Sequence, residues 1–329
     1  MAKQSLIFKD SKDSCSVING FLNLHKPRGI TAHDCISRVR KLLNQKKVGH
    51  SGTLDPMATG VLPIAIGNCT RLLRFLPEGK AYKATIRFGI ITNTDDMEGE
   101  ILTQKECPDL KLIDIERLLP LFQGTIQQRP PAFSAIQVNG VRLYDLARAG
   151  LPVEVPIRTV EVYKIEVLAW RSGSFPELDL MIACGSGTYI RAIARDLGEL
   201  LKCGATLSGL ERTFSNGFDL IDSKTFTEIA QIPETSEPSH GLISADAALQ
   251  NLAMIELPID AAKRWTQGQA LSTNQYSRYI SLDSNLSSAS TSGNNYRRIY
   301  AQAQFLGVGE IHVDQLIPVV VLETQLLSQ

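Results

Sequence analysis

Short stretches of alternating or continuous apolar residues predict β-strands along the whole chain. The alternation is clearest at residues 80–89, KAYKATIRFG, where every second side chain from Tyr82 onward is apolar. A continuous apolar run at residues 61–67 predicts a buried strand. The predicted strands are residues 20–24, 61–67, 80–89, 100–103, 160–170, 178–184 and 205–212.

Apolar residues spaced three and four apart predict helices between these strands. Thr31 or Asp34 can cap the first of them. Asn139-Gly140 predicts a hairpin turn. The predicted helices are residues 33–44, 69–75, 113–122 and 143–149, and one that follows Gly187 and ends near Leu201.

The composition is typical of a soluble globular protein with about two domains, with 329 residues of which 43% are hydrophobic and 21% charged. No apolar run is long enough for a transmembrane helix, and residues 1–14 lack the apolar core of a signal peptide, so we expect a cytoplasmic protein without membrane contact. The six cysteines are scattered without a CxxC pair, which argues against a zinc site and against disulfides. We expect buried free thiols and no bound metal.

Charge is distributed unevenly, although the net charge is zero. Residues 1–80 carry 13 Lys and Arg against 5 Asp and Glu, whereas residues 161–329 carry 12 against 19. This polarity is typical of a protein whose N-terminal part binds a polyanion, although a solvated basic surface without a ligand gives the same pattern.

The loop at residues 48–63, VGHSGTLDPMATGVLP, surrounds one carboxylate, Asp55, with three glycines and two prolines. The residue before a proline avoids the α region, so Asp55 should be extended and presented to a ligand. The alternative is that Asp55 only caps a helix beginning at Pro56. Six of the cations that precede the loop can keep a carboxylate ionised or bind phosphates: Lys26, Arg28, Arg38, Lys41, Lys46 and Lys47.

Two further segments carry candidate chemistry. Residues 123–158 combine a proline-led arm, the hairpin signal and a short basic helix, which indicates an insertion that folds onto a ligand or an ordinary surface excursion. In CGSGTYIR, Arg191 lies in the first turn of a helix, where a cation gains nothing from the helix dipole. Arg191 therefore pairs more plausibly with a buried carboxylate or a phosphate.

These segments together resemble the TruB-type tRNA pseudouridine synthases. The resemblance rests on GFLNLHKPRGITAHD, VGHSGTLDPMATGVLPIAIG, KAYKATIRFG, QRPPAFSAIQVNGVRLYDLARAG and CGSGTYIRAIARDLGELLKCGATLSGLERT, in that order, between about Gly20 and Leu220. It implies an α+β (mixed α/β) fold, with a catalytic sheet domain that carries an inserted RNA-clamping thumb, and a small C-terminal PUA-like β-barrel. The implied activity is isomerisation of the T-loop uridine at tRNA position 55 by base flipping, with tRNA as partner and no cofactor.

The resemblance also implies roles for individual residues. Asp55 matches the essential aspartate, which attacks ring C6 or sugar C1′, and Arg191 matches its partner. Tyr82 matches the tyrosine that stacks on the flipped base and helps to remove the C5 proton, and Leu210 matches an apolar wall of the pocket. His50 matches the loop histidine that supports the distorted RNA. The other implied RNA contacts are Lys26, Pro27, Arg129, Ser134 and Arg142.

The expected domains are a tail at residues 1–19, a catalytic domain at 20–250 with the thumb at about 123–158, and a C-terminal domain at 251–329. Residues 284–295 are a low-complexity insertion, for which we expect a mobile loop. We expect a monomer, because no repeat or heptad run indicates assembly. Two alternatives remain: a guide-RNA-dependent synthase of the related branch, and a tRNA-binding or tRNA-folding module without catalysis.

Overall fold

The computed structural model describes residues 18–134, 136–138, 141–142, 144, 155–231, 241–275 and 295–322. Among them, nine strands form one sheet with the order β1-β3-β12-β4-β11-β10-β7, in which β2 also pairs with β3 and β13 with β12. All pairings are antiparallel except that of β3 with β12. The strands are β1 (Gly20–Lys26), β2 (Val48–His50), β3 (Thr59–Ile66), β4 (Lys80–Phe88), β7 (Gly124–Gln128), β10 (Arg158–Arg171), β11 (Glu177–Cys184), β12 (Ala205–Ser215) and β13 (Phe218–Asp219).

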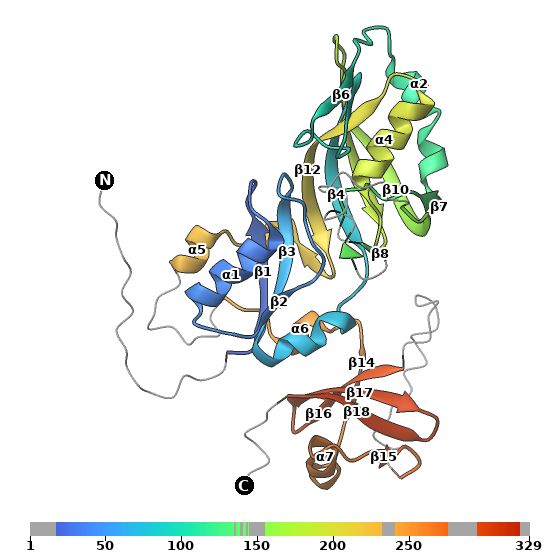
Figure 1. Ribbon diagram of the computed structural model, residues 1–329. Helices are drawn as coiled ribbons and strands as arrows, with labels where there is room; N and C mark the ends of the chain where they lie inside the picture. The colour runs from blue at the N-terminus through green and yellow to red at the C-terminus, as the bar shows by residue number, and fades with distance from the viewer. Residues whose placement is uncertain are drawn as a thin grey trace, which may run out of the picture.

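Helices pack on this sheet in two places (Figure 1). Helix α1 (Ala32–Leu42) begins at a capping box formed by Thr31 and Asp34, and its apolar side packs against β1 and β3. Helix α4 (Ile190–Leu200) packs against β4 and β12. The other helices are η1 (Gly67–Phe75), α2 (Leu112–Glu116), η2 (Leu119–Phe122), η3 (Leu220–Asp222), α5 (Phe226–Ala230) and α6 (Ala245–Ala248).

A second domain lies below the main sheet in Figure 1. Its five-stranded sheet has the order β14-β16-β17-β18-β15, and Trp265 is fully buried against it. One apolar cluster contains Phe21 and Leu72 of the first domain together with Val308 and Val320 of the second, so the two domains share a core. The elements are β14 (Ala253–Glu256), α7 (Ile259–Thr266), β15 (Leu271–Ser272), β16 (Tyr296–Ala301), β17 (Gln304–His312) and β18 (Gln315–Val321).

Two small hairpins complete the fold. Strands β5 (Ile90–Thr92) and β6 (Ile101–Gln104) pair antiparallel. Strands β8 (Gln137–Val138) and β9 (Val141–Arg142) also pair antiparallel, with Val138 opposite Val141. This antiparallel pairing agrees with the predicted hairpin, whose turn residues Asn139 and Gly140 lie outside the described residues.

The structure confirms the predicted strands and the mixed α/β character, and it changes two of the predicted helices. The helix expected at residues 113–122 is divided into α2 and η2, because Pro120 lies at the start of η2 and interrupts the helical hydrogen bonds. The helix expected at 69–75 is the 3₁₀ helix η1. Residues 1–17, most of the expected helix 143–149 and the insertion at 284–294 lie outside the described residues.

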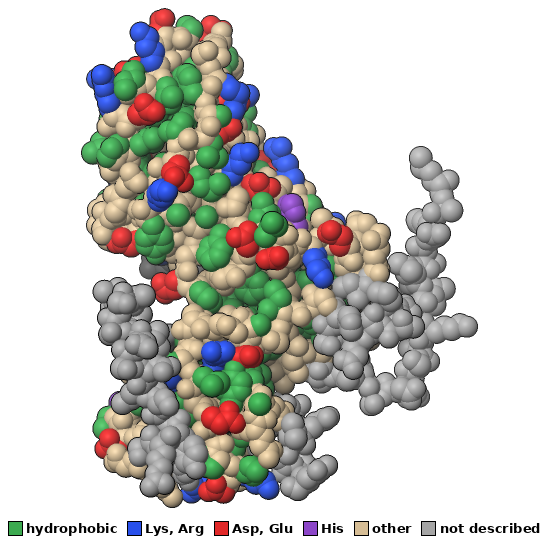
Figure 2. Space-filling model, turned by 180° about the vertical axis from the view of Figure 1, so that it is seen from behind, with side chains coloured by type: hydrophobic (Ala, Val, Ile, Leu, Met, Phe, Trp, Pro, Cys, Tyr) green, Lys and Arg blue, Asp and Glu red, His purple; other side chains and the backbone are tan. Residues whose placement is uncertain are grey.

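The basic bias of residues 1–80 does not become one uniform surface. Lys3, Lys9 and Lys12 lie outside the described residues, and Lys26 is fully buried. On the face that Figure 2 shows, positive and negative side chains of the described residues are interspersed. The sequence-level charge count therefore overstates the surface available to a polyanion.

Candidate active site

Asp55 lies in the connection between β2 and β3. No helix begins at Pro56, and a single turn forms instead, in which the Ala58 N–H donates to the Asp55 carbonyl at 3.1 Å. The interpretation of Asp55 as a helix cap is therefore wrong. The Asp55 side chain is 34% exposed, so the carboxylate lies at the protein surface with access to a ligand.

Arg191 binds this carboxylate with two nitrogens. Its Nε lies 3.0 Å from Asp55 Oδ2, and its Nη2 donates to Asp55 Oδ1 at 3.2 Å. The guanidinium also donates to the carbonyls of Thr94 (2.8 Å) and Phe133 (3.0 Å). Because the Arg191 side chain is only 6% exposed, these partners compensate for the burial of its charge. The structure thus pairs Arg191 with a carboxylate, one of the two partners expected from its position, although Asp55 is partly exposed and not buried.

The turn after β5 supplies two more carboxylates to helix α4. Asp96 Oδ2 lies 3.4 Å from Arg191 Nη1, and Asp95 Oδ2 lies 2.8 Å from Arg195 Nη1. Burial raises the pKa of the Asp95 carboxyl, and Arg195 opposes that shift. Sequence reasoning missed the role of this acidic turn. The available signal was two consecutive aspartates together with two arginines one helical turn apart.

Tyr82 and Leu210 lie on the neighbouring strands β4 and β12. Tyr82 pairs with Arg212 in register, and Leu210 pairs with Ala84. Tyr82 belongs to the apolar cluster that also contains Leu54 of the Asp55 loop, and Leu210 packs against that cluster. Burial raises the pKa of the Tyr82 phenol. The structure therefore brings Asp55, Arg191, Tyr82 and Leu210 to one region.

Arg212 is a site residue that sequence reasoning missed. It is fully buried, and its guanidinium donates to the carbonyls of Val61 (2.7 Å), Gly52 (3.1 Å) and Thr53 (3.4 Å). It therefore ties the two arms of the Asp55 loop to β12. A charged residue in an otherwise ordinary strand pattern was the only sequence signal.

Lys26 and Pro27, which were expected to contact RNA, lie beneath the same loop. Lys26 is fully buried, and its Nζ donates to the carbonyls of Ala58 (2.6 Å), Pro27 (3.0 Å) and Pro56 (3.2 Å). Three acceptors match the three donors of an ammonium group. Burial lowers the pKa of the Lys26 ammonium. In this structure Lys26 holds the backbone that follows Asp55.

His50 ends β2 at the start of the Asp55 loop, and it is half-buried. Its Nδ1 is buried without a hydrogen-bond partner in the described structure. Burial lowers the pKa of its imidazole, and the nearby charge of Arg212 adds to the effect. Lys80 Nζ also lies close to the backbone of this loop at Gly52. If Gly52 had a Cβ, that atom would lie 3.0 Å from Lys80 Nζ.

The first residues of the expected thumb at about 123–158 belong to the main sheet, because β7 (Gly124–Gln128) pairs with β10, and the chain leaves the sheet after Gln128. Arg129 is exposed, and Ser134 is buried. Gln128 is 2% exposed and is bound to the backbone of Tyr189, the residue before α4. Arg142 lies in β9, and its side chain is outside the described part of the structure. The structure thus joins the base of this segment to the helix that carries Arg191.

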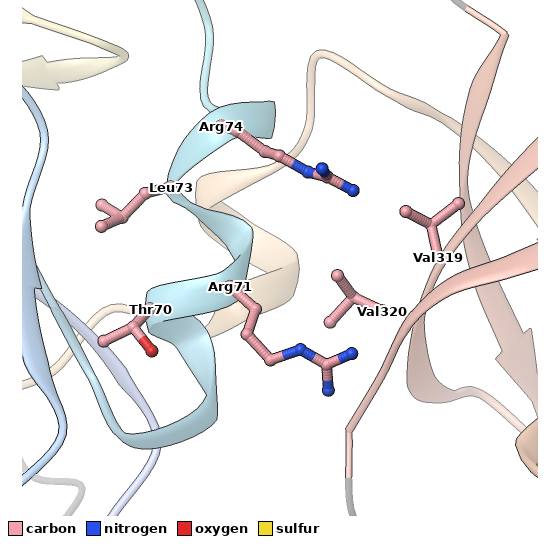
Figure 3. Close-up of a pocket in the computed structure, with 6 residues that line it drawn as sticks. All are labelled: Thr70, Arg71, Leu73, Arg74, Val319 and Val320. Atoms are coloured by element: carbon pink, nitrogen blue, oxygen red, sulfur yellow. The ribbon is translucent and has the colours of Figure 1, made fainter.

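A separate cavity of about 480 Å³ lies between η1 and β18, at the boundary of the two domains (Figure 3). Its lining contains two arginines and no carboxylate. Arg71 donates through Nη1 to the carbonyl of Val321 at 3.3 Å, and Arg74 extends toward the same gap. The lining residues are Thr70, Arg71, Leu73, Arg74, Val319 and Val320.

Within the part of the chain that the structure describes, no group of three or more His, Cys, Asp or Glu side chains could hold a metal ion. No helix among these residues has the length and apolar character needed to cross a membrane.

Two parts of the chain match two different family models. Residues 40–190 match the TruB family pseudouridylate synthase (N terminal domain), and residues 253–322 match the pseudouridine synthase II TruB C-terminal domain. The tRNA pseudouridine synthase B of Nostoc sp. is 53% identical over 312 residues, which are 93% of this chain and 99% of that protein. That of Acaryochloris marina is 48% identical over 306 residues, covering 93% of this chain and 99% of that protein.

Solved structures agree in fold. A crystal structure of a Cbf5-Nop10-Gar1 complex contains a chain with a TM-score of 0.67 and 25% identity, and the match covers 92% of this chain and 84% of that chain. A structure of an H/ACA RNP bound to a substrate RNA containing 2′-deoxyuridine gives a TM-score of 0.64 at 23% identity, again over 92% of this chain and 84% of that chain. The expected pseudouridine-synthase sheet domain and C-terminal PUA-like domain are thereby confirmed. The similarity to full-length relatives and the matches of both domains place this chain in the TruB family of pseudouridylate synthases.

Proposed function

We propose that this protein is a tRNA pseudouridine synthase that isomerises the T-loop uridine at tRNA position 55. The carrying observation is the bidentate Arg191–Asp55 pair, presented on a partly exposed loop beside Tyr82. The proposal is supported by relatives named tRNA pseudouridine synthase B that match this chain over almost their whole length.

The reaction exchanges one glycosidic bond for another. The N1–C1′ bond breaks, the uracil turns, the C5–C1′ bond forms, C5 loses a proton and N1 gains one. No atom and no electron is gained overall. An oxygen of Asp55 attacks sugar C1′ or ring C6 and leaves again.

Arg191 orients the Asp55 carboxylate for this attack. A guanidinium that contacts both oxygens fixes the plane of the carboxylate and leaves an outward lone pair for the substrate. The carbonyls of Thr94 and Phe133 hold the guanidinium in turn. A fixed nucleophile needs less reorganisation on the way to the transition state.

Tyr82 and Leu210 form the wall that receives the flipped base. Extruding a base costs a few kcal/mol, which stacking on an aromatic ring offsets. Because burial raises the pKa of the Tyr82 phenol, the group is protonated at neutral pH. We therefore assign stacking on the base to Tyr82. Removal of the C5 proton by Tyr82 would first require the buried phenol to ionise, which burial disfavours.

The tRNA contacts are proposals of the same kind. We assign His50 a contact to the RNA beside the extruded base, and its buried Nδ1 is unpartnered among the described residues. Arg129, Ser134 and Arg142 lie in the segment expected to close on the T stem-loop.

Arg71 and Arg74 offer two cations to a phosphate at the domain boundary. Lys26 and Pro27 are assigned a supporting role under the Asp55 loop instead of a direct RNA contact.

We also propose that the enzyme acts as a monomer, with a catalytic domain at residues 20–250 and a C-terminal domain at 251–329. The monomer is supported by the sequence, which has no repeat or heptad run that indicates assembly. Separate apolar clusters within each part support the division, although one further cluster joins them.

The test is release of tritium from C5 of uridine in an unmodified tRNA transcript. Wild-type protein should release it, Asp55→Asn should not, and Asp109→Asn, an exposed carboxylate, should behave as wild type. Changing the T-loop uridine to cytidine should abolish release. Tight tRNA binding by wild type without any release would contradict the proposal and favour a binding module without catalysis.

A further inference from the structure

The segment that follows β7 is tied to helix α4 by a side chain with no role in the proposed chemistry. Gln128 ends β7, and its amide serves both backbone polar groups of Tyr189. Its Oε1 accepts from the Tyr189 N–H at 2.8 Å, and its Nε2 donates to the Tyr189 carbonyl at 3.0 Å. Tyr189 is the N-cap of α4 and lacks a side-chain cap. Gln128 therefore provides the hydrogen bonds that hold the first turn of the helix to the sheet.

A second attachment lies one residue further along the segment. Arg195 donates through Nη2 to the carbonyl of Arg129 at 2.7 Å. Its other nitrogens contact Asp95 and Asp196, both at 2.8 Å, so its position is fixed from three sides.

The third attachment is Arg191 itself. Its Nη2 donates both to the Phe133 carbonyl and to Asp55 Oδ1. Between Arg129 and Phe133 the chain contains two consecutive buried prolines, Pro130 and Pro131, which limit the conformations of the segment. Residues 128–133 and the first turns of α4 are thus joined at three points around the guanidinium that orients the nucleophile.

We propose that Gln128 is a positioning residue for Arg191, a role that rests on the proposed function. By holding the N-cap of α4 against the end of β7, Gln128 sets the distance between the Arg191 guanidinium and both of its anchors, the Phe133 carbonyl and Asp55. Gln128 does not touch the substrate. Its loss reorients Arg191 and slows the chemical step while RNA affinity is retained.

The test compares Gln128→Leu with Gln127→Leu. Leu removes both hydrogen bonds with little change in volume. Gln127 is the exposed neighbour, and among the described residues its amide donates to the Thr159 hydroxyl of β10. Under single-turnover conditions, Gln128→Leu should slow tritium release at least about tenfold and change the tRNA dissociation constant less than about threefold. Gln127→Leu should match wild type in both. Equal effects of the two variants, or a loss of affinity as large as the loss of rate, would overturn the proposal.

A double-mutant cycle separates positioning from general damage to the fold. In an Arg191→Lys background, which lacks the forked contacts, Gln128→Leu should slow the reaction less than about twofold, because it has no guanidinium left to position. The same slowing in both backgrounds would contradict a role through Arg191. If Gln128→Leu does not fold, Gln128→Glu replaces it, since Glu keeps the acceptor for the Tyr189 N–H and removes the donor to the Tyr189 carbonyl.

The outcomes distinguish this inference from the proposed function. Absence of tritium release by the wild-type protein contradicts the function. Release by wild type together with an unimpaired Gln128→Leu variant contradicts only the inference. Hydrogen exchange at the Tyr189 amide gives a readout independent of activity, and it should become faster in Gln128→Leu and remain unchanged in Gln127→Leu.

Discussion

Arg191 contacts both carboxylate oxygens of Asp55, although 136 positions separate the two residues in the chain. The pair joins the loop before β3 to the first turn of α4. It is held from the opposite side by the carbonyls of Thr94 and Phe133 and by Asp96. One buried guanidinium thus organises three separate segments around one partly exposed carboxylate.

The Arg191→Lys substitution tests the geometry of this pair. An ammonium group keeps the charge but cannot contact both oxygens and two carbonyls at once. We expect single-turnover tritium release to slow about 100-fold, equivalent to about 3 kcal/mol in the activation barrier. Affinity for tRNA should change little, as measured by filter binding. A rate near that of wild type would show that charge alone suffices.

Arg212→Lys tests how the Asp55 loop is held to β12. A single ammonium cannot reach the carbonyls of Gly52, Thr53 and Val61 together, so buried acceptors lose their donors. Unfolding in urea should show a loss of about 2–3 kcal/mol in the free energy of unfolding, and the rate should also fall. Arg117→Lys, at an exposed ion pair with Asp114, is the control and should leave stability unchanged.

Lys26→Met separates loop support from RNA contact. Met fills the site but leaves the carbonyls of Pro27, Pro56 and Ala58 without their donor. The free energy of unfolding should fall by about 2–4 kcal/mol, whereas the folded variant should bind tRNA with wild-type affinity. Unchanged stability together with a tenfold loss of affinity would restore the interpretation of Lys26 as a direct RNA contact.

Gly60→Ala tests the close contact between β3 and β12. Gly60 has φ +99°, and a Cβ there would lie 2.3 Å from the Arg212 carbonyl oxygen. Gly124 has φ +82° with no atom within 4 Å of such a Cβ, so Gly124→Ala isolates the conformational cost, about 1–2 kcal/mol. Gly60→Ala should cost at least about 3 kcal/mol by urea unfolding, because backbone atoms must also move. If both variants lost the same free energy of unfolding, β3 and β12 would be able to move apart around the new Cβ at no cost.

His50 predicts a pH dependence of stability. Burial lowers the pKa of its imidazole in the folded protein, so the unfolded state binds more protons between that lowered pKa and about 6.5, the usual value. The contribution of His50 to stability is therefore complete above about pH 6.5 and declines as the pH falls below it. Between pH 7 and pH 5, wild type should lose more stability in urea than His50→Gln does. Parallel stability curves for the two proteins would contradict the lowered pKa.

Local sequence was sufficient for much of the architecture. The alternating stretch at 80–89 becomes β4, Thr31 and Asp34 form the predicted cap of α1, and β8 pairs with β9 on either side of the predicted turn. These features depend on side-chain period, capping and turn geometry, which act over a few residues. Asp55 and Arg191 were also recognisable as candidates, because proline and glycine around a carboxylate and a cation at a helix start are local anomalies.

The tertiary structure alone decided how these candidates are held. Gln128 carries no local signal of function, the signals at Arg212 and Asp96 do not reveal their partners, and Lys26 has the sequence pattern of a surface cation. Their roles arise because the parallel pairing of β3 with β12 and the packing of α4 bring carbonyls and carboxylates from distant segments around buried donors. A buried charge destabilises the fold unless other groups pair with it or form hydrogen bonds to it. Here those groups come from distant segments, so long-range packing determines them and a local sequence pattern does not.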